Sequence, residues 1–148
     1  MKKLLLIFIF LLSECGFQPI YINKSLDNVE FFKITLEGDA DINRKIVESL
    51  SFKENELQDT LNSLLIKSSY IISETSKNSK GQVESYKSQI ILSLIIKDNN
   101  KVIESKNFSK EFSYNTKDNK FELVRYQNEV KENLIFKIIE DIILYMNI

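Results

Sequence analysis

The only cysteine of the chain, Cys15, follows a short apolar run and is the residue best placed for covalent chemistry. Lys2 and Lys3 come first, the nine residues 4–12 are all apolar, and small or polar residues follow at once. This order is typical of a secretory signal, and the run is too short to span a bilayer, which takes about 20 apolar residues. The sequence therefore predicts a signal peptide over residues 1–14 that is removed on export.

The residues around Cys15 indicate a lipoprotein signal rather than an ordinary one. Leu12 and Ser13 before the cysteine, and Gly16 after it, fit the site at which lipoprotein precursors are cleaved and acylated. Glu14 departs from this pattern, in which the residue before the cysteine is small. Acyl chains on Cys15 would hold the protein at a membrane, because each buried methylene contributes about 0.8 kcal/mol. The alternative is a secreted protein with an incidental cysteine.

Composition argues against several classes of chemistry. The chain has no histidine, and an acylated Cys15 would carry no free thiol, which removes the ligands of most zinc and copper sites and the base of Ser-His catalysis. Acidic residues near the C-terminus, such as Glu129 and Glu140, are expected on a solvated face rather than as a catalytic pair. The chain has 20 Lys plus Arg and 21 Asp plus Glu, so it has no excess of positive charge that would attract nucleic acid. We expect no enzymatic activity, no metal and no cofactor.

After removal of the signal, about 134 residues remain, which is enough for one domain and too few for two ordinary ones. Residues 15–28 contain the only proline, Pro19, and several turn formers, so we expect them to form a lipidated tether. Residues 29–148 are expected to form a single α+β domain.

Apolar periodicity predicts six elements in this domain. Alternation of apolar and polar residues indicates four strands, at residues 32–37, 64–73, 83–97 and 102–114. Steps of three and four residues indicate two helices, at residues 40–50 and 123–145. In the third strand, apolar residues on both parities favour a central position in the sheet. In the fourth strand, Val102, Phe108, Phe112 and Tyr114 are expected to share one face.

The order strand-helix-strand-strand-strand-helix predicts a two-layer α+β sandwich. Two helices on one face of a four-stranded sheet would bury every apolar stripe. The second sheet face would then remain uncovered. The residues expected on it are mostly polar: Lys33, Thr35, Lys67, Ser69, Gln89, Ser93 and Ser109.

The sequence also resembles a known family. The start of the mature chain, Cys15-Gly16-Phe17-Gln18-Pro19-Ile20-Tyr21, resembles the Cys-Gly-Phe-x-Pro-Leu-Tyr start of the LPS-assembly lipoproteins known as LptE. Ile20 replaces the usual leucine. The C-terminal half is similar to that of the family at Phe112-Ser113-Tyr114-Asn115, Phe121-Glu122-Leu123, Asn133-Leu134 and Asp141-Ile142-Ile143.

The resemblance implies an outer-membrane lipoprotein that faces the periplasm and sits in the lumen of a large LptD-type β-barrel. It implies that the protein helps this barrel to assemble and to deliver lipopolysaccharide to the cell surface. The alternative is a free-standing lipoprotein that binds a small lipid or peptide. Such a carrier should keep a cavity of about 300 Å³ or more, whereas the alternation of residues predicts a closed core.

Two lysines are candidates for contact with lipopolysaccharide. Lys106 and Lys110 lie two positions on either side of Phe108, so the three side chains share one face of the fourth strand. This basic and aromatic patch could contact phosphates of lipid A or of a core sugar. The alternative is that the lysines protect an edge strand from pairing with another chain.

Overall fold

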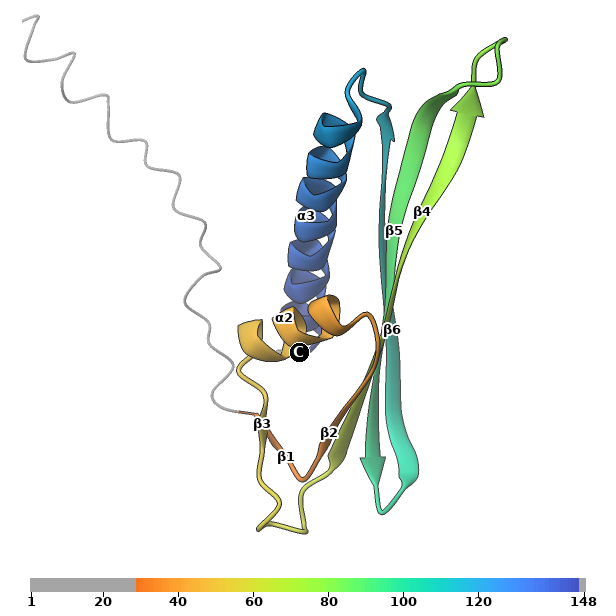
Figure 1. Ribbon diagram of the computed structural model, residues 1–148. Helices are drawn as coiled ribbons and strands as arrows, with labels where there is room; N and C mark the ends of the chain where they lie inside the picture. Colours follow the sequence, from red (N-terminus) through yellow and green to blue (C-terminus); the bar gives the residue numbers. More distant parts are fainter. Residues whose placement is uncertain (1–28, 147–148) are drawn as a thin grey trace, which may run out of the picture.

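The computed structural model describes residues 29–146, so the predicted signal peptide and tether lie outside the described residues. Figure 1 shows a long sheet with both helices beside it. The strands and helices are β1 (Glu30–Phe31), β2 (Ile34–Gly38), α2 (Ala40–Ser49), β3 (Lys53–Glu54), β4 (Ser63–Lys77), β5 (Val83–Asp98), β6 (Lys101–Asn115) and α3 (Lys120–Met146).

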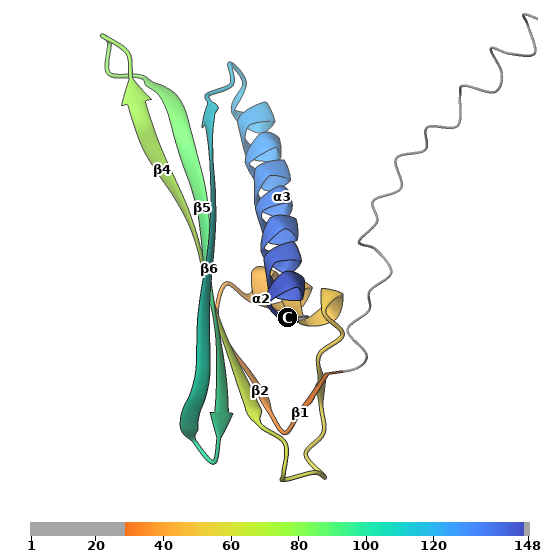
Figure 2. The same ribbon diagram turned by 180° about the vertical axis from the view of Figure 1, so that it is seen from behind.

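The main sheet has four strands in the order β2-β4-β5-β6. β5 is antiparallel to both of its neighbours, whereas β2 pairs with β4 in parallel. α2 and α3 cover the same face, as the two opposite views show (Figures 1 and 2). This confirms the predicted α+β fold. A second, two-stranded parallel sheet of β1 and β3 was not predicted, because strands of two residues have no measurable periodicity.

The chain passes from β2 to α2 through a tight junction at Gly38 and Asp39. Gly38 has φ +95°, a conformation that favours glycine, and the Asp39 N–H donates to the Ser68 carbonyl at 3.2 Å. The Asp39 carboxylate then caps the helix, accepting from the N–H groups of Asp41 at 3.1 Å and Ile42 at 3.0 Å. α2 is therefore fixed next to the end of β2 and the middle of β4.

β5 and β6 form a hairpin whose turn is set by two asparagines. Asn99 has φ 45° and Asn100 has φ 67°, as a type I′ turn requires. A bulge follows, because Ile96 pairs with Glu104 whereas Lys97 pairs with Val102. Val102 therefore leaves the face that carries Phe108, and the prediction that they share a face was wrong.

The core lies between the sheet and the two helices. The predicted stripe of α3 is confirmed, since Val130, Leu134, Ile138 and Ile142 are all buried. Ile135 and Ile139 are buried as well. α2 lies beside the C-terminal half of α3 (Figure 1). Because α3 contacts both the sheet and α2 there, it buries a wider apolar stripe, which includes Ile135 and Ile139.

Candidate functional site

The residue predicted to carry acyl chains, Cys15, lies outside the described residues, and its modification remains a prediction. Within residues 29–146, neither helix has the length and apolar composition needed to cross a bilayer. Across the same residues, no group of three or more side chains is arranged to hold a metal ion.

The two candidate lysines lie on the helix-covered side of β6. Lys106 pairs across the sheet with Leu94, and Lys110 pairs with Ile90, both of which are buried core residues. β6 forms one edge of the sheet, so the long lysine side chains can reach past the core to α3. The structure thus brings Lys106 and Lys110 to the same side of the strand as Phe108, as predicted.

Both lysines already have partners on α3. Lys110 Nζ lies 2.7 Å from Asp141 Oδ2, and Lys106 Nζ lies 5.2 Å from the centre of the Tyr145 ring. The Tyr145 hydroxyl donates to Glu104, and this hydrogen bond raises the pKa of Tyr145. A phosphate at this site would have to compete with Asp141 for Lys110.

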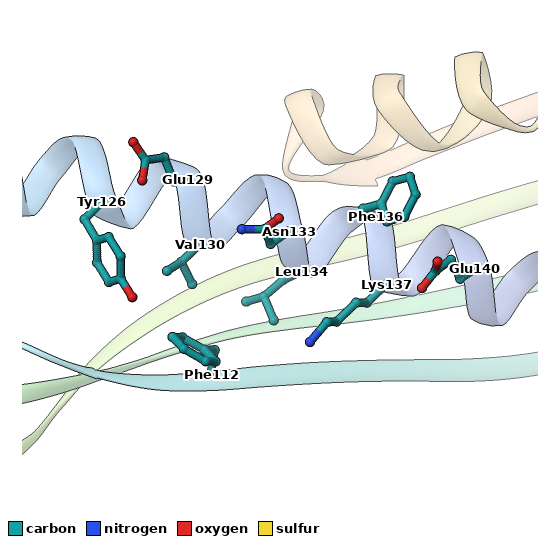
Figure 3. Close-up of a pocket in the computed structure, with 9 residues that line it drawn as sticks. All are labelled: Phe112, Tyr126, Glu129, Val130, Asn133, Leu134, Phe136, Lys137 and Glu140. Carbon is teal, nitrogen blue, oxygen red and sulfur yellow. The ribbon is translucent and has the colours of Figure 1, made fainter. Parts of the chain in front are cut away.

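A groove of about 420 Å³ runs between α3 and the outer edge of β6. Tyr126, Val130 and Leu134 point from α3 toward Phe112 on β6 (Figure 3). The lining residues are Phe112, Tyr126, Glu129, Val130, Asn133, Leu134, Phe136, Lys137 and Glu140. The floor of the groove is thus apolar, and charged side chains lie beside it.

The groove exists because β6 has no neighbour on its outer side. Phe112 pairs with the buried Ser88, so its side chain lies on the helix-facing side of the sheet. No further strand covers it within the described residues, and it remains 44 % exposed. The closed core predicted from the alternation is therefore present, but an open apolar groove adjoins it at the β6 edge.

A chain of buried hydroxyl groups fixes α3 to the sheet above this groove. Ser88 Oγ lies 3.0 Å from the hydroxyl oxygens of both Tyr70 and Tyr114. The Tyr70 hydroxyl also donates to the Gln127 carbonyl at 3.3 Å. Burial raises the pKa of Tyr70, although the hydrogen bond with Ser88 opposes this shift. The sequence signal that could have indicated this network was Ser88 itself, a small polar residue on the core-facing parity of β5.

The second face of the sheet is uncovered by either helix, as predicted (Figure 2). Polar side chains pair across it: Ser93 donates to Asn107 at 2.6 Å, and Gln89 donates to Ser109 at 3.3 Å. Lys67 forms an ion pair with Glu37 at 2.8 Å. Ile91 is 39 % exposed on the same face, so the surface is mainly polar but also presents single apolar side chains.

Several solved structures have a similar arrangement of strands and helices. Rare lipoprotein B from Shewanella oneidensis matches with a TM-score of 0.61 at 14% sequence identity, over 78% of this chain and 93% of that one. The fold is similar to that of known lipoproteins. Uncharacterized lipoprotein B from Nitrosomonas europaea matches with a TM-score of 0.52 at 12% identity, over 84% of this chain and 88% of that one.

At these identities the likeness to rare lipoprotein B concerns the fold. No protein-family model and no curated protein matches the chain. Evidence for a function therefore comes from the surfaces described above and from the sequence resemblance around Cys15.

Proposed function

We propose that this protein is an outer-membrane lipoprotein that occupies the lumen of an LptD-type β-barrel and helps this barrel to assemble and to deliver lipopolysaccharide. In this proposal Cys15 carries the acyl chains, and the domain faces the periplasm and the barrel lumen. The protein acts through binding and has no catalytic role.

The observation that carries this proposal is the uncovered sheet face. Its paired polar side chains, such as Ser93 with Asn107, form a mainly polar surface that suits the polar interior of a membrane barrel. Exposed Ile91 adds apolar contact area of the kind found in stable protein interfaces. The lipoprotein fold and the resemblance around Cys15 support the same proposal.

Lipopolysaccharide contact belongs to the same proposal. Lys110 lies at the β6 edge in an ion pair with Asp141 that is about one-third exposed on each side, so a phosphate can reach its ammonium group. Lys106 lies on the same side of the strand and offers a second positive charge. We expect Lys110→Ala to weaken binding of purified lipid A, whereas Lys87→Ala, on the other sheet face, should leave binding unchanged.

The experiment that tests the barrel partnership is affinity purification of the tagged protein from detergent-solubilised membranes. A large β-barrel recovered in stoichiometric amount would support the proposal. The Ile91→Glu variant should reduce this recovery, whereas Leu144→Glu, on the exposed side of α3, should not. Recovery of only inner-membrane or soluble proteins would contradict the proposal.

The α3–β6 groove favours a second candidate function, the binding of a small lipid or peptide. Its volume of about 420 Å³ exceeds the size of about 300 Å³ at which ligand pockets begin. If this candidate is right, a ligand should co-purify with the protein, and Phe112→Glu, at a half-exposed residue of the groove, should abolish its retention without affecting any barrel partner.

A further inference from the structure

A second apolar groove lies at the opposite edge of the sheet, along β2. It has a volume of about 280 Å³ and is lined by Ile34 and Leu36 of β2, Val47 of α2, and Phe52 and Glu54 from the β3 segment. Because β2 ends the sheet on this side, no strand within the described residues covers its outer edge.

Leu36 shows that this groove is an uncovered part of the core. It pairs with Ile66, which is fully buried, so Leu36 lies on the helix-facing side of β2. It is nevertheless 45 % exposed. At one end of the groove, the Ile34 N–H donates to Glu54 Oε1 at 2.6 Å, so a side chain already satisfies one edge donor. An apolar segment that covered Leu36 would complete the two-layer packing at this edge.

The chain enters the domain beside this groove. The Lys53 N–H donates to the Val29 carbonyl at 3.1 Å, and Lys53 lies between the lining residues Phe52 and Glu54. The segment that precedes Val29 is therefore attached to the domain next to the groove. The α3–β6 groove lies at the other edge of the sheet, three strands away.

The sequence before Val29 has the pattern that the groove requires. Ile20, Ile22 and Leu26 share one parity, on which Lys24 is the one polar residue, whereas Asn23 and Ser25 lie on the other parity. Ile22 lies seven positions before Val29, which gives a reach of up to about 25 Å. We propose that residues 20–26 lie along the free edge of β2 and place Ile20, Ile22 and Leu26 in the groove with Leu36.

This docking shortens the free tether and depends neither on the barrel partner nor on acylation. With residues 20–26 held on β2, only residues 15–19 link the predicted anchor to the domain, a span of about 17 Å at full extension. The β2 edge of the domain would then lie close to the anchored membrane, and the domain would rotate less freely than on a long linker.

Fluorescence can test this docking because the natural chain has no tryptophan. The protein would be the full mature chain, residues 15–148, with Cys15→Ser to keep it lipid-free. The Ile22→Trp variant should show blue-shifted emission and several-fold weaker quenching by acrylamide than the Asn23→Trp variant. Adding Leu36→Asp to Ile22→Trp should remove both effects, whereas adding Leu144→Asp, at the other sheet edge, should not.

Circular dichroism would establish that each variant is folded, and Leu36→Ala would replace Leu36→Asp if the charge unfolds the chain. Equal quenching of the Ile22→Trp and Asn23→Trp variants would overturn the proposal. So would emission that does not respond to a change at Leu36. A blue shift that grows with protein concentration would identify a second copy of the chain as the source of the contact and would also overturn docking within one chain.

Discussion

Lys131 of α3 lies 3.2 Å from Asp39, the residue that caps the N-terminus of α2. The same ammonium group lies 3.2 Å from Asp41 and 5.4 Å from the centre of the Tyr70 ring on β4. The Lys131 side chain is only 16% exposed, so solvent screens these interactions weakly. One lysine thus joins both helices to the sheet.

Replacement of Lys131 should destabilise the domain. Lys131→Met keeps much of the apolar stem but leaves Asp39 and Asp41 without their shared partner, so we expect a loss of about 1–3 kcal/mol in the free energy of unfolding. Urea denaturation of the soluble domain would measure it. Arg125→Met, which breaks an exposed pair with Glu129, is the matched control and should change stability by less than about 0.5 kcal/mol. Equal losses of stability in the two variants would contradict a stabilising role for the contacts of Lys131 with Asp39 and Asp41.

The same cluster predicts a loss of stability in acid. Burial alone would raise the pKa of Asp39, but hydrogen bonds from the Ile42 N–H and from Lys131 outweigh it and hold the pKa below its ordinary value. The hydrogen bond from Lys131 is the largest influence on Asp41 and lowers its pKa despite some burial.

A carboxyl group with a lowered pKa in the folded state binds fewer protons there than in the unfolded chain. Its contribution to stability is therefore complete above the unfolded pKa of about 3.9 and is lost as pH falls through the folded pKa. The urea concentration at the midpoint of unfolding, measured at pH values from 6 to 2, should decrease once the pH is below about 4. The Asp39→Asn variant should show a shallower fall, and an identical pH profile would contradict this assignment.

Gly38 should tolerate no side chain. A Cβ atom at this position would lie 1.8 Å from the Ser68 carbonyl oxygen, and φ is +95°. We expect Gly38→Ala to destabilise the domain by at least about 2 kcal/mol, because the backbone of β2 or β4 must move. Gly81 is the natural control: its φ is +79°, but a Cβ atom would meet no atom within 4 Å, so Gly81→Ala should cost about 1 kcal/mol.

Acylation of Cys15 is testable in cells. We expect the wild-type protein to incorporate a palmitate analogue and to fractionate with membranes, since residues 1–16 have the pattern of a lipoprotein signal. The Cys15→Ser variant should take up no label and should be released as a soluble protein in cells that lack the proposed barrel partner. Absence of label on the wild-type protein would contradict acylation of Cys15.

The sequence allowed most of the fold to be predicted, because each large element has a strong apolar period. The stripe of α3 and the alternation in β5 both led to correct assignments. Val102 was placed on the wrong face because a bulge shifts the register by one residue, and alternation cannot locate a bulge.

The grooves and the partners of the candidate lysines were beyond sequence reasoning. Phe112 is on a core-facing parity and should be buried by that criterion, but its exposure depends on β6 lying at the edge of the sheet. The pairing of Lys110 with Asp141 depends on where α3 crosses the strand. Strand order and helix placement are long-range properties that a local pattern does not encode.

The connectivity of the main sheet also sets the order in which its parts can form. β4, β5 and β6 are neighbours in sequence, whereas the parallel contact of β2 with β4 must enclose α2 and the following loop. Since closing a longer loop costs more entropy, we expect pulse-labelled hydrogen exchange to protect β5 before β2. In an exported chain that emerges with its N-terminus first, β2 and α2 would then leave the translocation channel early. β2 would have no partner strand until β4 has also left the channel.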